Sequence, residues 1–274
     1  MNIAVDIGNT CVKFGVFPPD KENKIVGYWR LPSDETGWVN EVFLKTMTSM
    51  VFLTNRTRSL SQRKEGEVKP YPDPLTWRIA QTGNFPVKKF KTEILAFRPK
   101  DTFRTVMRRQ IPLKRDVDAP NQVGIDRLLA AYAAVKRYGD APMLVVDVGT
   151  AITVDVVQNQ TFCGGAILPG LNALAETYPR ISPKLPRIGH DAAIKIGLNY
   201  PGGNTKSAVF TGIYWGTVGA IRQFYEMHPQ KKDALLILTG GDAQFFLSGL
   251  IQMIPAWRIE HHDTLVLEGI NLIP

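Results

Sequence analysis

Two short stretches of the sequence place an aspartate directly before a glycine-containing turn between apolar segments. The first runs NIAVDIGNTCVKFGVF, with Asp6 ahead of the turn, and the second runs PMLVVDVGTAITVDVV, with Asp147 in the same place. Glycine in a turn removes a side chain that would hold a ligand away from the backbone. The backbone N–H groups of such a turn can then donate to phosphate oxygens. One copy is ordinary hairpin sequence, whereas two copies in register favour phosphate binding.

The side chains around these turns extend the same chemistry. Thr10 and Thr150 would add hydroxyl donors, and Lys13 could neutralise phosphate charge. Asp6 would place a carboxylate beside the phosphates, where Mg²⁺ prefers one or two carboxylates together with water and phosphate oxygens. The sequence contains no GxxxxGK[ST] loop and no GxGxxG that opens a helix. Neither a P-loop nor a dinucleotide-type Rossmann site is therefore indicated.

The elements that must position these turns form an internal repeat. Residues 1–17 read as a β-hairpin, and the stretch around Asp147 reads as a second one. The two aspartates are separated by about half of the 274-residue chain. A repeat of this length predicts two similar α/β domains that face each other, because solenoid units are only ~20–50 residues long. We place the domains at residues 1–118 and 119–274.

The remaining segments fill out an α/β pattern. The clearest helix is expected at 121–140, where Asn121 can cap the start and Gly139 can end it. A second helix, interrupted by glycines, is expected at 204–228. Strands are predicted at 25–32, 76–83, 92–97 and 161–171, a helix at 36–52, a surface loop at 55–73, and a strand, Gly-Gly turn and helix at 234–251.

Composition narrows the class of protein. Hydrophobic residues make up 44% of the chain, which is enough for a core, and the net charge is +8. The basic runs carry no aromatic RNA-binding signature, so we expect a solvated basic face and neither nucleic-acid nor membrane binding. Cys11 and Cys163 lack CxxC partners and are expected to be reduced, buried thiols. Because no secretory signal or membrane-length apolar run is apparent, we expect a soluble cytoplasmic protein.

Six motifs occur in a fixed order and carry a resemblance to a known family. They read DIGNTCVK, PNQVGIDR, DVGTAIT, GGAILPG, NTKSAVFTG and TGGDA. Together they resemble type III pantothenate kinase, a member of the acetate and sugar kinase/Hsp70/actin superfamily. The likeness covers the N-terminal hairpin and essentially everything from Pro120 to the end of the chain. Each motif alone is unspecific, whereas the ordered set is specific.

The resemblance implies a fold, an activity and a set of ligands. It implies an α/β fold of two RNase H-like (actin/Hsp70-type) domains with mixed sheets flanked by helices. The activity would be ATP-dependent phosphorylation of pantothenate to 4′-phosphopantothenate, the first step of coenzyme A biosynthesis. The family uses Mg²⁺ and a monovalent cation, K⁺ or NH₄⁺. It forms homodimers in which the substrate pocket lies at the subunit interface.

The resemblance also assigns roles to residues. Asp147 would hold the monovalent cation, Thr150 would contact ATP, and Asp126 would be the catalytic base. Thr205 would complete the substrate pocket of the neighbouring subunit. Pantothenate would lie against Gly124, Ile125, Asp126 and Arg127, and the ATP phosphates against Asp6, Ile7, Gly8, Asn9, Thr10, Cys11, Val12 and Lys13.

The chemistry of Asp126 and Arg127 agrees with these roles. Phosphoryl transfer needs the attacking oxygen held in line with the γ-phosphorus. A carboxylate cannot ionise an alcohol fully beforehand, so Asp126 would orient the hydroxyl and accept its proton late. Arg127 supplies a guanidinium fork suited to the carboxylate of pantothenate. From the residues alone, an Asp-Arg pair early in a helix is more often a solvated ion pair.

Two features leave alternatives open. Gly240, Gly241 and Asp242 either contact the nucleotide or form only a tight strand-to-helix turn. Val117 stands where the family usually has a tyrosine that lines the pantothenate pocket. A kinase for another small hydroxylated substrate is therefore one alternative. The other is a non-catalytic regulatory or transcriptional relative with affinity for nucleic acid.

Overall fold

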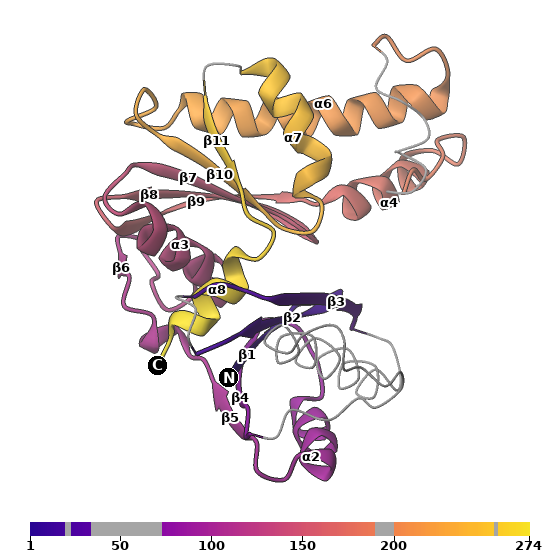
Figure 1. Cartoon of the computed structure of the whole chain (residues 1–274). Coiled ribbons are helices and arrows are strands. Elements are labelled where there is room, and N and C mark those ends of the chain that lie inside the picture. Colours follow the sequence, from indigo (N-terminus) through magenta and orange to yellow (C-terminus); the bar gives the residue numbers. More distant parts are fainter. Residues whose placement is uncertain (20–22, 34–72, 190–199, 255–256) are drawn as a thin grey trace, which may run out of the picture. The chain divides into compact units, whose positions relative to one another are not determined.

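The computed structural model describes residues 1–19, 23–33, 73–189, 200–254 and 257–274 (Figure 1). The helix expected at 36–52 and nearly all of the loop expected at 55–73 lie outside these residues. The chain forms two compact units, which we describe separately. The first unit comprises Met1–Ile111, Gly124–Leu129 and Val266–Pro274, and the second comprises Pro112–Val123 and Ala130–Leu265. The contiguous division at residue 118 stays a prediction.

The first unit is built on a five-stranded mixed sheet with the order β3-β2-β1-β4-β5. The pairs β1–β2 and β2–β3 are antiparallel, whereas β1–β4 and β4–β5 are parallel. The predicted hairpin and third strand are confirmed by β1 (Asn2–Ile7), β2 (Cys11–Phe17) and β3 (Gly27–Pro32), and the strand expected at 76–83 by β4 (Thr76–Gln81). The edge strand β5 spans Thr102–Thr105.

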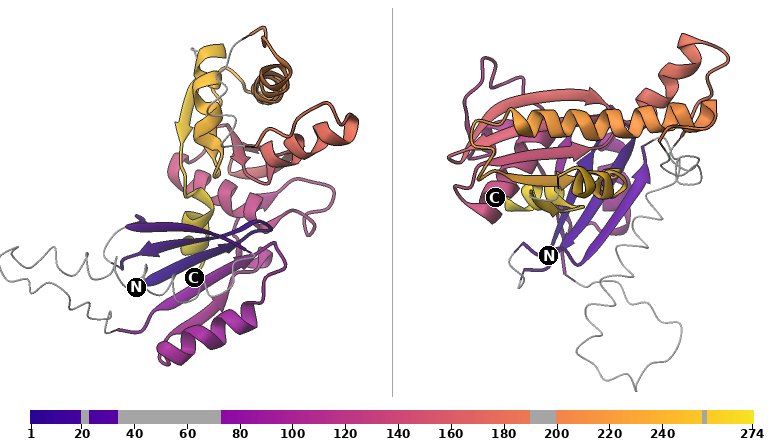
Figure 2. Two further views of the ribbon diagram at one scale, coloured as in Figure 1. Left: turned by 90° about the vertical axis from the view of Figure 1, so that its right-hand side faces the viewer. Right: turned by 90° about the horizontal axis from the view of Figure 1, so that it is seen from above.

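The two faces of this sheet carry different layers. Side chains alternate along a strand, so Ile3, Val5 and Ile7 share one face of β1. They pack with Phe90 and Ile94 of α2 (Val87–Phe97) in one core cluster. The opposite face carries α8 (Leu265–Leu272), as the left view of Figure 2 shows. On that face the Asn2 side-chain amide donates to Asn271 Oδ1. The Arg78 guanidinium donates to the carbonyls of Asn271 and Ile273.

One prediction for the first unit is wrong. Residues 92–97 were expected to form a strand, but they are the second half of α2. The buried residues Phe90 and Ile94 are four positions apart, which is the spacing of one helix face. The six residues TEILAF are too few to show the spacing of a helix face by themselves.

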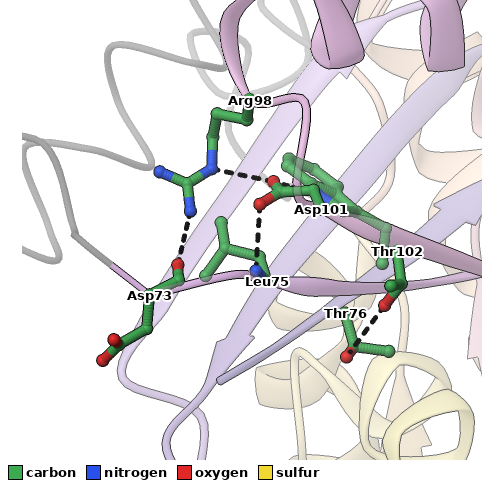
Figure 3. Close-up of polar contacts among 7 residues, drawn as sticks. Asp73, Leu75, Thr76, Arg98, Asp101 and Thr102 are labelled. Carbon is green, nitrogen blue, oxygen red and sulfur yellow. Dashed lines mark hydrogen bonds and ion pairs between the residues drawn. The ribbon is translucent and has the colours of Figure 1, made fainter.

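A buried carboxylate fixes the entry of β4 (Figure 3). Asp101 accepts hydrogen bonds from the Leu75 N–H at 3.0 Å and from Trp77 Nε1 at 2.8 Å. It also accepts one from Arg98 Nε at 2.8 Å, and Arg98 in turn donates to the Asp73 carbonyl at 2.6 Å. Buried carboxylates are tolerated when they are paired and hydrogen-bonded in this way.

The second unit repeats this sheet. Its six strands have the order β11-β10-β7-β8-β9-β6, in which β9-β8-β7-β10-β11 corresponds to β3-β2-β1-β4-β5. The antiparallel and parallel pairs also match in the two units. The expected fold class, two mixed sheets flanked by helices, is confirmed. The strands are β6 (Lys114–Arg115), β7 (Met143–Val148), β8 (Ala151–Gln158), β9 (Thr161–Pro169), β10 (Leu235–Thr239) and β11 (Arg258–His261).

Helices cover both faces of the second sheet (Figure 1). On one face, α6 (Thr205–Glu226) and α7 (Ala243–Met253) pack against Leu144, Val146 and Val148 of β7. The other face carries α3 (Ile125–Tyr138), whose first turn belongs to the first unit. The short helix α4 (Leu171–Ile181) follows β9, and the 3-10 turn η2 (Arg108–Gln110) follows β5 in the first unit.

Helix ends differ from expectation in two places. The predicted helix at 121–140 starts at Ile125, so Asn121 does not cap it, and the first bond runs from the Leu128 N–H to the Gly124 carbonyl. Gly139 ends it as predicted, with φ at 64°. The helix at 204–228 is not interrupted by its glycines, because burial of ten α6 side chains outweighs their low helix propensity.

Two further expectations concern the burial of the cysteine thiols and the presence of a membrane-spanning helix. Cys11 and Cys163 are free but only half-buried, so the prediction of buried thiols is wrong. Cys11 is the first residue of β2, directly after an exposed turn, which explains its partial exposure. Within the described ranges, no helix combines the length and apolar character needed to cross a membrane.

Candidate active site

The first repeated turn connects β1 to β2 and carries a charged pair. Asp6 lies one residue before the end of β1 and is 7% exposed. The carboxylate oxygen Oδ2 lies 3.6 Å from Lys13 Nζ, and Lys13 faces it in the strand register. The turn is closed by the Gly8 N–H, which donates to the Cys11 carbonyl at 3.0 Å. Asn9 and Thr10 at the tip are exposed, so their polar groups are accessible to a ligand.

The residues after β4 hold this turn from one side. The N–H groups of Thr82 and Gly83 donate to the Ile7 carbonyl at 2.9 and 3.1 Å. Gly83 lies so close to the turn that a Cβ there would be 2.2 Å from the Gly8 carbonyl oxygen. Glycine at 83 is therefore required by the close approach of two backbone segments.

The second repeated turn has the same support. The Gly149 N–H donates to the Ala151 carbonyl at 3.0 Å, and the Asp242 N–H donates to the Val148 carbonyl at 3.0 Å. Gly240 has φ at 101°, and a Cβ there would be 2.4 Å from Asp147 Oδ1. Gly240 thus lies against the Asp147 carboxylate as Gly83 lies against the Gly8 carbonyl.

The rows of side chains that flank the two aspartates differ in charge. In the strand register Asp6 faces Lys13, which faces Arg30 of β3. Asp147 faces Thr153 of β8 and Thr239 of β10, and both of these neighbours are uncharged. Cross-strand pairs lie on one face, with Cβ atoms about 4.5–5.5 Å apart. The first turn is thus flanked by cations, and the second by hydroxyl groups.

Asp126 and Arg127 lie in the first turn of α3, which belongs to the same compact unit as Asp6 and Lys13. Both residues are half-buried, and the Arg127 N–H donates to Asp126 Oδ1 at 2.9 Å. A Cβ on Gly124 would be 2.5 Å from that same oxygen, so glycine makes room for the carboxylate. A carboxylate is favoured in the first turn by the unpaired N–H groups of the helix start.

The position of this turn follows from packing within the first unit. Leu129, one turn further along α3, presents its carbonyl oxygen 2.3 Å from where a Cβ on Gly269 of α8 would be. Helix α8 in turn reaches the sheet at Gly15, where a Cβ would be 3.3 Å from Leu267. Gly15 is two residues from Lys13 and so shares its strand face, which is also the face of Asp6. The layer that carries Asp126 therefore covers the Asp6 face of the sheet.

Thr205 is the first residue of α6 and is exposed. The preceding Asn204 has a structural role, since its side chain accepts from the Ser207 N–H at 3.0 Å and caps the helix. A cavity of about 780 Å³ starts one turn further along α6, at Ala208, and does not include Thr205. It is lined by Tyr200, Gly202, Ala208, Thr211, Gly212, Trp215, Gln252 and Met253.

Val117 lies on the second sheet. The segment that holds it is fixed by the Asp116 N–H, which donates to the Phe162 carbonyl at 2.9 Å. The Val117 side chain lies over Gly164 of β9, where a Cβ would be 3.3 Å from it. Gly164 has φ at 88°, which favours glycine, so the valine packs against bare backbone.

No histidine or cysteine cluster adds to this site. Among the residues that the structure describes, no group of three or more His, Cys, Asp and Glu side chains could hold a metal ion. Asp6 and Asp147 each supply one carboxylate within their own unit.

Sequence reasoning missed the residues that support the turns from behind. Gly83 was not selected as a site residue, although the Thr-Gly pair Thr82-Gly83 just after β4 repeats the pair Thr239-Gly240 at the end of β10. Ser33 and Gly170 were also missed. Ser33 follows the Leu-Pro pair that ends β3, Gly170 follows the Leu-Pro pair that ends β9, and this repeat would have identified both.

Two sheets that share the order of five strands, each with an aspartate before a turn closed by glycine, form two RNase H-like halves, which is the fold class of actin and Hsp70. Solved structures share this fold. A protein from Campylobacter jejuni, described as a Baf family transcriptional activator, matches with a TM-score of 0.54 at 21% identity, over 99% of this chain and 96% of that one. The ethanolamine utilization protein EutJ from Carboxydothermus hydrogenoformans matches with a TM-score of 0.52 at 13% identity, over 99% and 89% of the chains.

Sequence comparison identifies the family within this class. The family model of type III pantothenate kinase matches residues 78–227. The type III pantothenate kinase of Persephonella marina is 32% identical over 253 residues, which is 91% of either chain. That of Gluconobacter oxydans is 31% identical over 280 residues, 100% of this chain and 92% of that one. The chain belongs to the type III pantothenate kinase family.

Proposed function

We propose that this protein transfers the γ-phosphoryl group of ATP to the terminal hydroxyl of pantothenate, the first step of coenzyme A biosynthesis. The observation that carries the proposal is the repeated Asp turn in a member of this family, with Asp126 in the same compact unit as the first turn. The uncharged neighbours of the second aspartate and the cations beside the first give the two turns separate tasks.

The first turn is suited to the phosphates of ATP. Its backbone N–H groups, the Thr10 hydroxyl and the Lys13 ammonium group would contact the phosphate oxygens of a nucleotide bound along residues 6–13. Thr150 is a further phosphate contact in this proposal. Asp6 offers the single carboxylate that Mg²⁺ commonly combines with phosphate oxygens and water. When bound, Mg²⁺ would offset the charge of the transferring group.

The second turn is suited to a monovalent cation. A Cβ on Gly240 would be 2.4 Å from Asp147 Oδ1, so only glycine lets the residues after β10 lie this close to the carboxylate. The neighbouring side chains Thr153 and Thr239 bear hydroxyl groups and no competing positive charge. K⁺ is bound in proteins by oxygen atoms that replace its water shell. We therefore assign K⁺ or NH₄⁺ to Asp147, where it would add positive charge near the nucleotide.

Asp126 and Arg127 act on the acceptor. Asp126 accepts the proton of the pantothenate hydroxyl as the new O–P bond forms and the bond to the leaving ADP oxygen breaks. Arg127 binds the carboxylate of pantothenate. Gly124 and Ile125, which directly precede Asp126, also contact the substrate. Fixing the substrate at its carboxylate holds the distant hydroxyl in position for attack.

A homodimer is part of the proposal. Tyr200, which is 85% exposed, and Trp215 line the largely apolar cavity beside α6 and α7. Exposed apolar surface of this kind often marks a protein interface. Thr205 at the start of α6 would then reach the pantothenate of the neighbouring subunit. Two free cysteines and the use of ATP agree with a cytoplasmic enzyme.

The decisive experiment measures ADP release with pantothenate, with and without K⁺. The native chain should turn over in a K⁺-dependent manner, and Asp126→Asn should lower kcat by ~10²-fold or more, as for loss of a general base. Asp233→Asn, which changes an exposed aspartate after α6, is the matched control and should keep native activity. Full activity of Asp126→Asn would remove the assigned base.

The same assay separates the alternatives. Val117 in place of the usual tyrosine makes other small hydroxylated acids worth testing as acceptors. ATP turnover with one of these and none with pantothenate would indicate a kinase of different specificity. No turnover with any acceptor, together with salt-dependent retention on DNA, would indicate a regulatory relative.

A further inference from the structure

Ser33 contacts both carbonyl groups at the tip of the first turn. It directly follows β3, and its N–H donates to the Thr10 carbonyl at 3.1 Å. Its hydroxyl Oγ donates to the Asn9 carbonyl at 2.9 Å. A residue 24 positions away in the sequence thus fixes two consecutive peptide groups of the turn that the proposed function assigns to ATP.

The second unit contains only half of this arrangement. Gly170 directly follows β9, and its N–H donates to the Thr150 carbonyl at 3.1 Å, as Ser33 does to Thr10. A Cβ on Gly170 would be 2.1 Å from the Gly149 carbonyl oxygen, so no side chain fits there. The first turn is longer because it includes Asn9, and the Asn9 carbonyl is the group that receives the serine hydroxyl.

The planar peptide group turns this contact into a constraint on the opposite side of the backbone. The Asn9 carbonyl and the Thr10 N–H belong to one peptide unit, so they point in opposite directions. When Ser33 holds the carbonyl, the direction of the Thr10 N–H is also set. The hydroxyl of Ser33 therefore acts on a donor that it does not touch.

We propose that Ser33 is a positioning residue for the binding of the ATP phosphates. It acts through the peptide between Asn9 and Thr10, whose N–H it holds in a fixed direction. The inference rests on the proposed function of this turn as the phosphate site. Donors that are already aligned need no reorganisation when the charged phosphates arrive. In the second turn, whose aspartate we assign to a monovalent cation, the position of Ser33 is taken by Gly170, which supplies the backbone bond alone.

The test compares Ser33→Ala with Ser33→Thr. Ser33→Ala keeps the N–H bond to Thr10 and removes the hydroxyl bond to Asn9, whereas Ser33→Thr keeps both donors. Calorimetric titration with ATP should show binding by Ser33→Ala that is about three- to tenfold weaker, as for loss of one hydrogen bond. KM for ATP should rise by the same factor, KM for pantothenate should stay unchanged, and Ser33→Thr should recover the native values.

A matched control is Ser182→Ala. Ser182 also makes one side-chain bond to the backbone, since its Oγ accepts from the Lys184 N–H at 3.3 Å. It lies at the end of α4, and its replacement should leave both KM values unchanged. Equal rises in both KM values for Ser33→Ala, accompanied by a lower Tm, would point to a merely structural role and overturn the inference.

The two proposals fail in distinguishable ways. Native ATP affinity in Ser33→Ala would overturn the role of Ser33, even if pantothenate is phosphorylated normally. A native chain that binds ATP but does not phosphorylate pantothenate would refute the assigned acceptor and leave the binding comparison valid. A native chain that binds no ATP would refute both.

Discussion

The two hairpin turns share a backbone plan and differ in the side chains around it. Each turn is closed by a glycine N–H, held by the residue after β3 or β9, and held again by residues after β4 or β10. Around Asp6 the strand neighbours include Lys13 and, one strand further, Arg30. Around Asp147 they are Thr153 and Thr239. The backbone is repeated in the two turns, whereas the charge in the neighbouring strands is not, and the ligands that we propose for the turns follow this difference in charge.

The difference agrees with the separate roles that we propose for the two aspartates. Positive side chains beside Asp6 suit a polyanion, whereas an acidic group among hydroxyls suits a cation. The glycines after β4 and β10 differ in the group that each one approaches. Gly83 approaches a backbone carbonyl, and Gly240 approaches the carboxylate itself. The following experiments test whether the two turns can be impaired separately.

Removal of the charge beside each turn should have the largest effect. Lys13→Met takes away the ammonium group 3.6 Å from Asp6, and both side chains are mostly buried. Because the proposed phosphate contact of Lys13 would be lost, and a hydrogen bond to a charged group contributes about 1.5–3 kcal/mol, kcat/KM for ATP should fall about 10²-fold. Asp147→Asn should instead abolish activation by K⁺. Steady-state assays with varied ATP and varied K⁺ would measure both effects.

The matched control for Lys13→Met is Lys89→Met, which removes a largely exposed lysine of α2 and should change neither constant. The comparison would be contradicted if Asp147→Asn retained native K⁺ activation. It would also be contradicted if Lys13→Met lost K⁺ activation and kept its affinity for ATP.

Adding a methyl group behind each turn should have an intermediate effect. Gly83→Ala would push a Cβ to within 2.2 Å of the Gly8 carbonyl, and Gly240→Ala would do the same at Asp147. Backbone strain of this kind costs on the order of 1–3 kcal/mol, so ATP binding by Gly83→Ala should weaken about tenfold. Gly240→Ala should mainly raise the K⁺ concentration needed for activity. Titration with ATP and K⁺ dependence of the rate would separate them.

Gly219→Ala provides the control for these variants. No atom lies within 4 Å of a Cβ at Gly219, which is inside α6, so activity should be native and the helix slightly more stable. If Gly83→Ala and Gly240→Ala changed the same constant, the two turns would not have separate tasks.

The smallest expected effect concerns acid stability. The first unit contains no histidine, whereas His228 of the second unit is buried and its Nδ1 accepts from the Gln230 N–H at 3.1 Å. Burial lowers the pKa of His228, although a backbone contact with Met143 opposes the shift. The neutral imidazole therefore stabilises the fold above the unfolded pKa of about 6.5, and this stability is lost as pH falls below that value.

Thermal unfolding between about pH 8 and about pH 5 would measure this effect, because histidine titrates within that range. The Tm of the native chain should fall as pH drops below about 6.5, and His228→Asn should show a flatter profile over the same range. An equally steep fall in His228→Asn would assign the acid sensitivity to other groups.

Much of the fold could be predicted because its signals are local. The turn after Asp6, the repeat at Asp147 and the strand-turn-helix around Gly240 are all visible in runs of adjacent residues. The prediction of a strand at 92–97 was wrong for the opposite reason. The helical spacing is visible only between Ile94 and Phe90, and Phe90 lies outside that run. The continuous α6 also escaped local reasoning, because its glycines are compensated by burial against the sheet.

The reactive groups proposed for the site were selected from the sequence, whereas the residues that support the turns were not. Asp6 and Lys13 were selected from their side-chain chemistry and Asp126 from the family resemblance, and the structure places these three in one compact unit. Ser33 and Gly83 support the first turn through contacts that depend on strand order. No property of a serine or glycine by itself indicates such a contact, so only a comparison of the two repeats could have found it.

The carboxylate of Asp101 has a practical consequence for the long connection between β3 and β4. The start of β4 is held by bonds from Leu75, Trp77 and Arg98 to that carboxylate, all made by residues that follow the connection. The entropic cost of joining two fixed ends grows only slowly with the length of chain between them. We therefore expect an affinity tag or a fluorescent label inserted between β3 and β4 to leave the pairing of β1 with β4 intact.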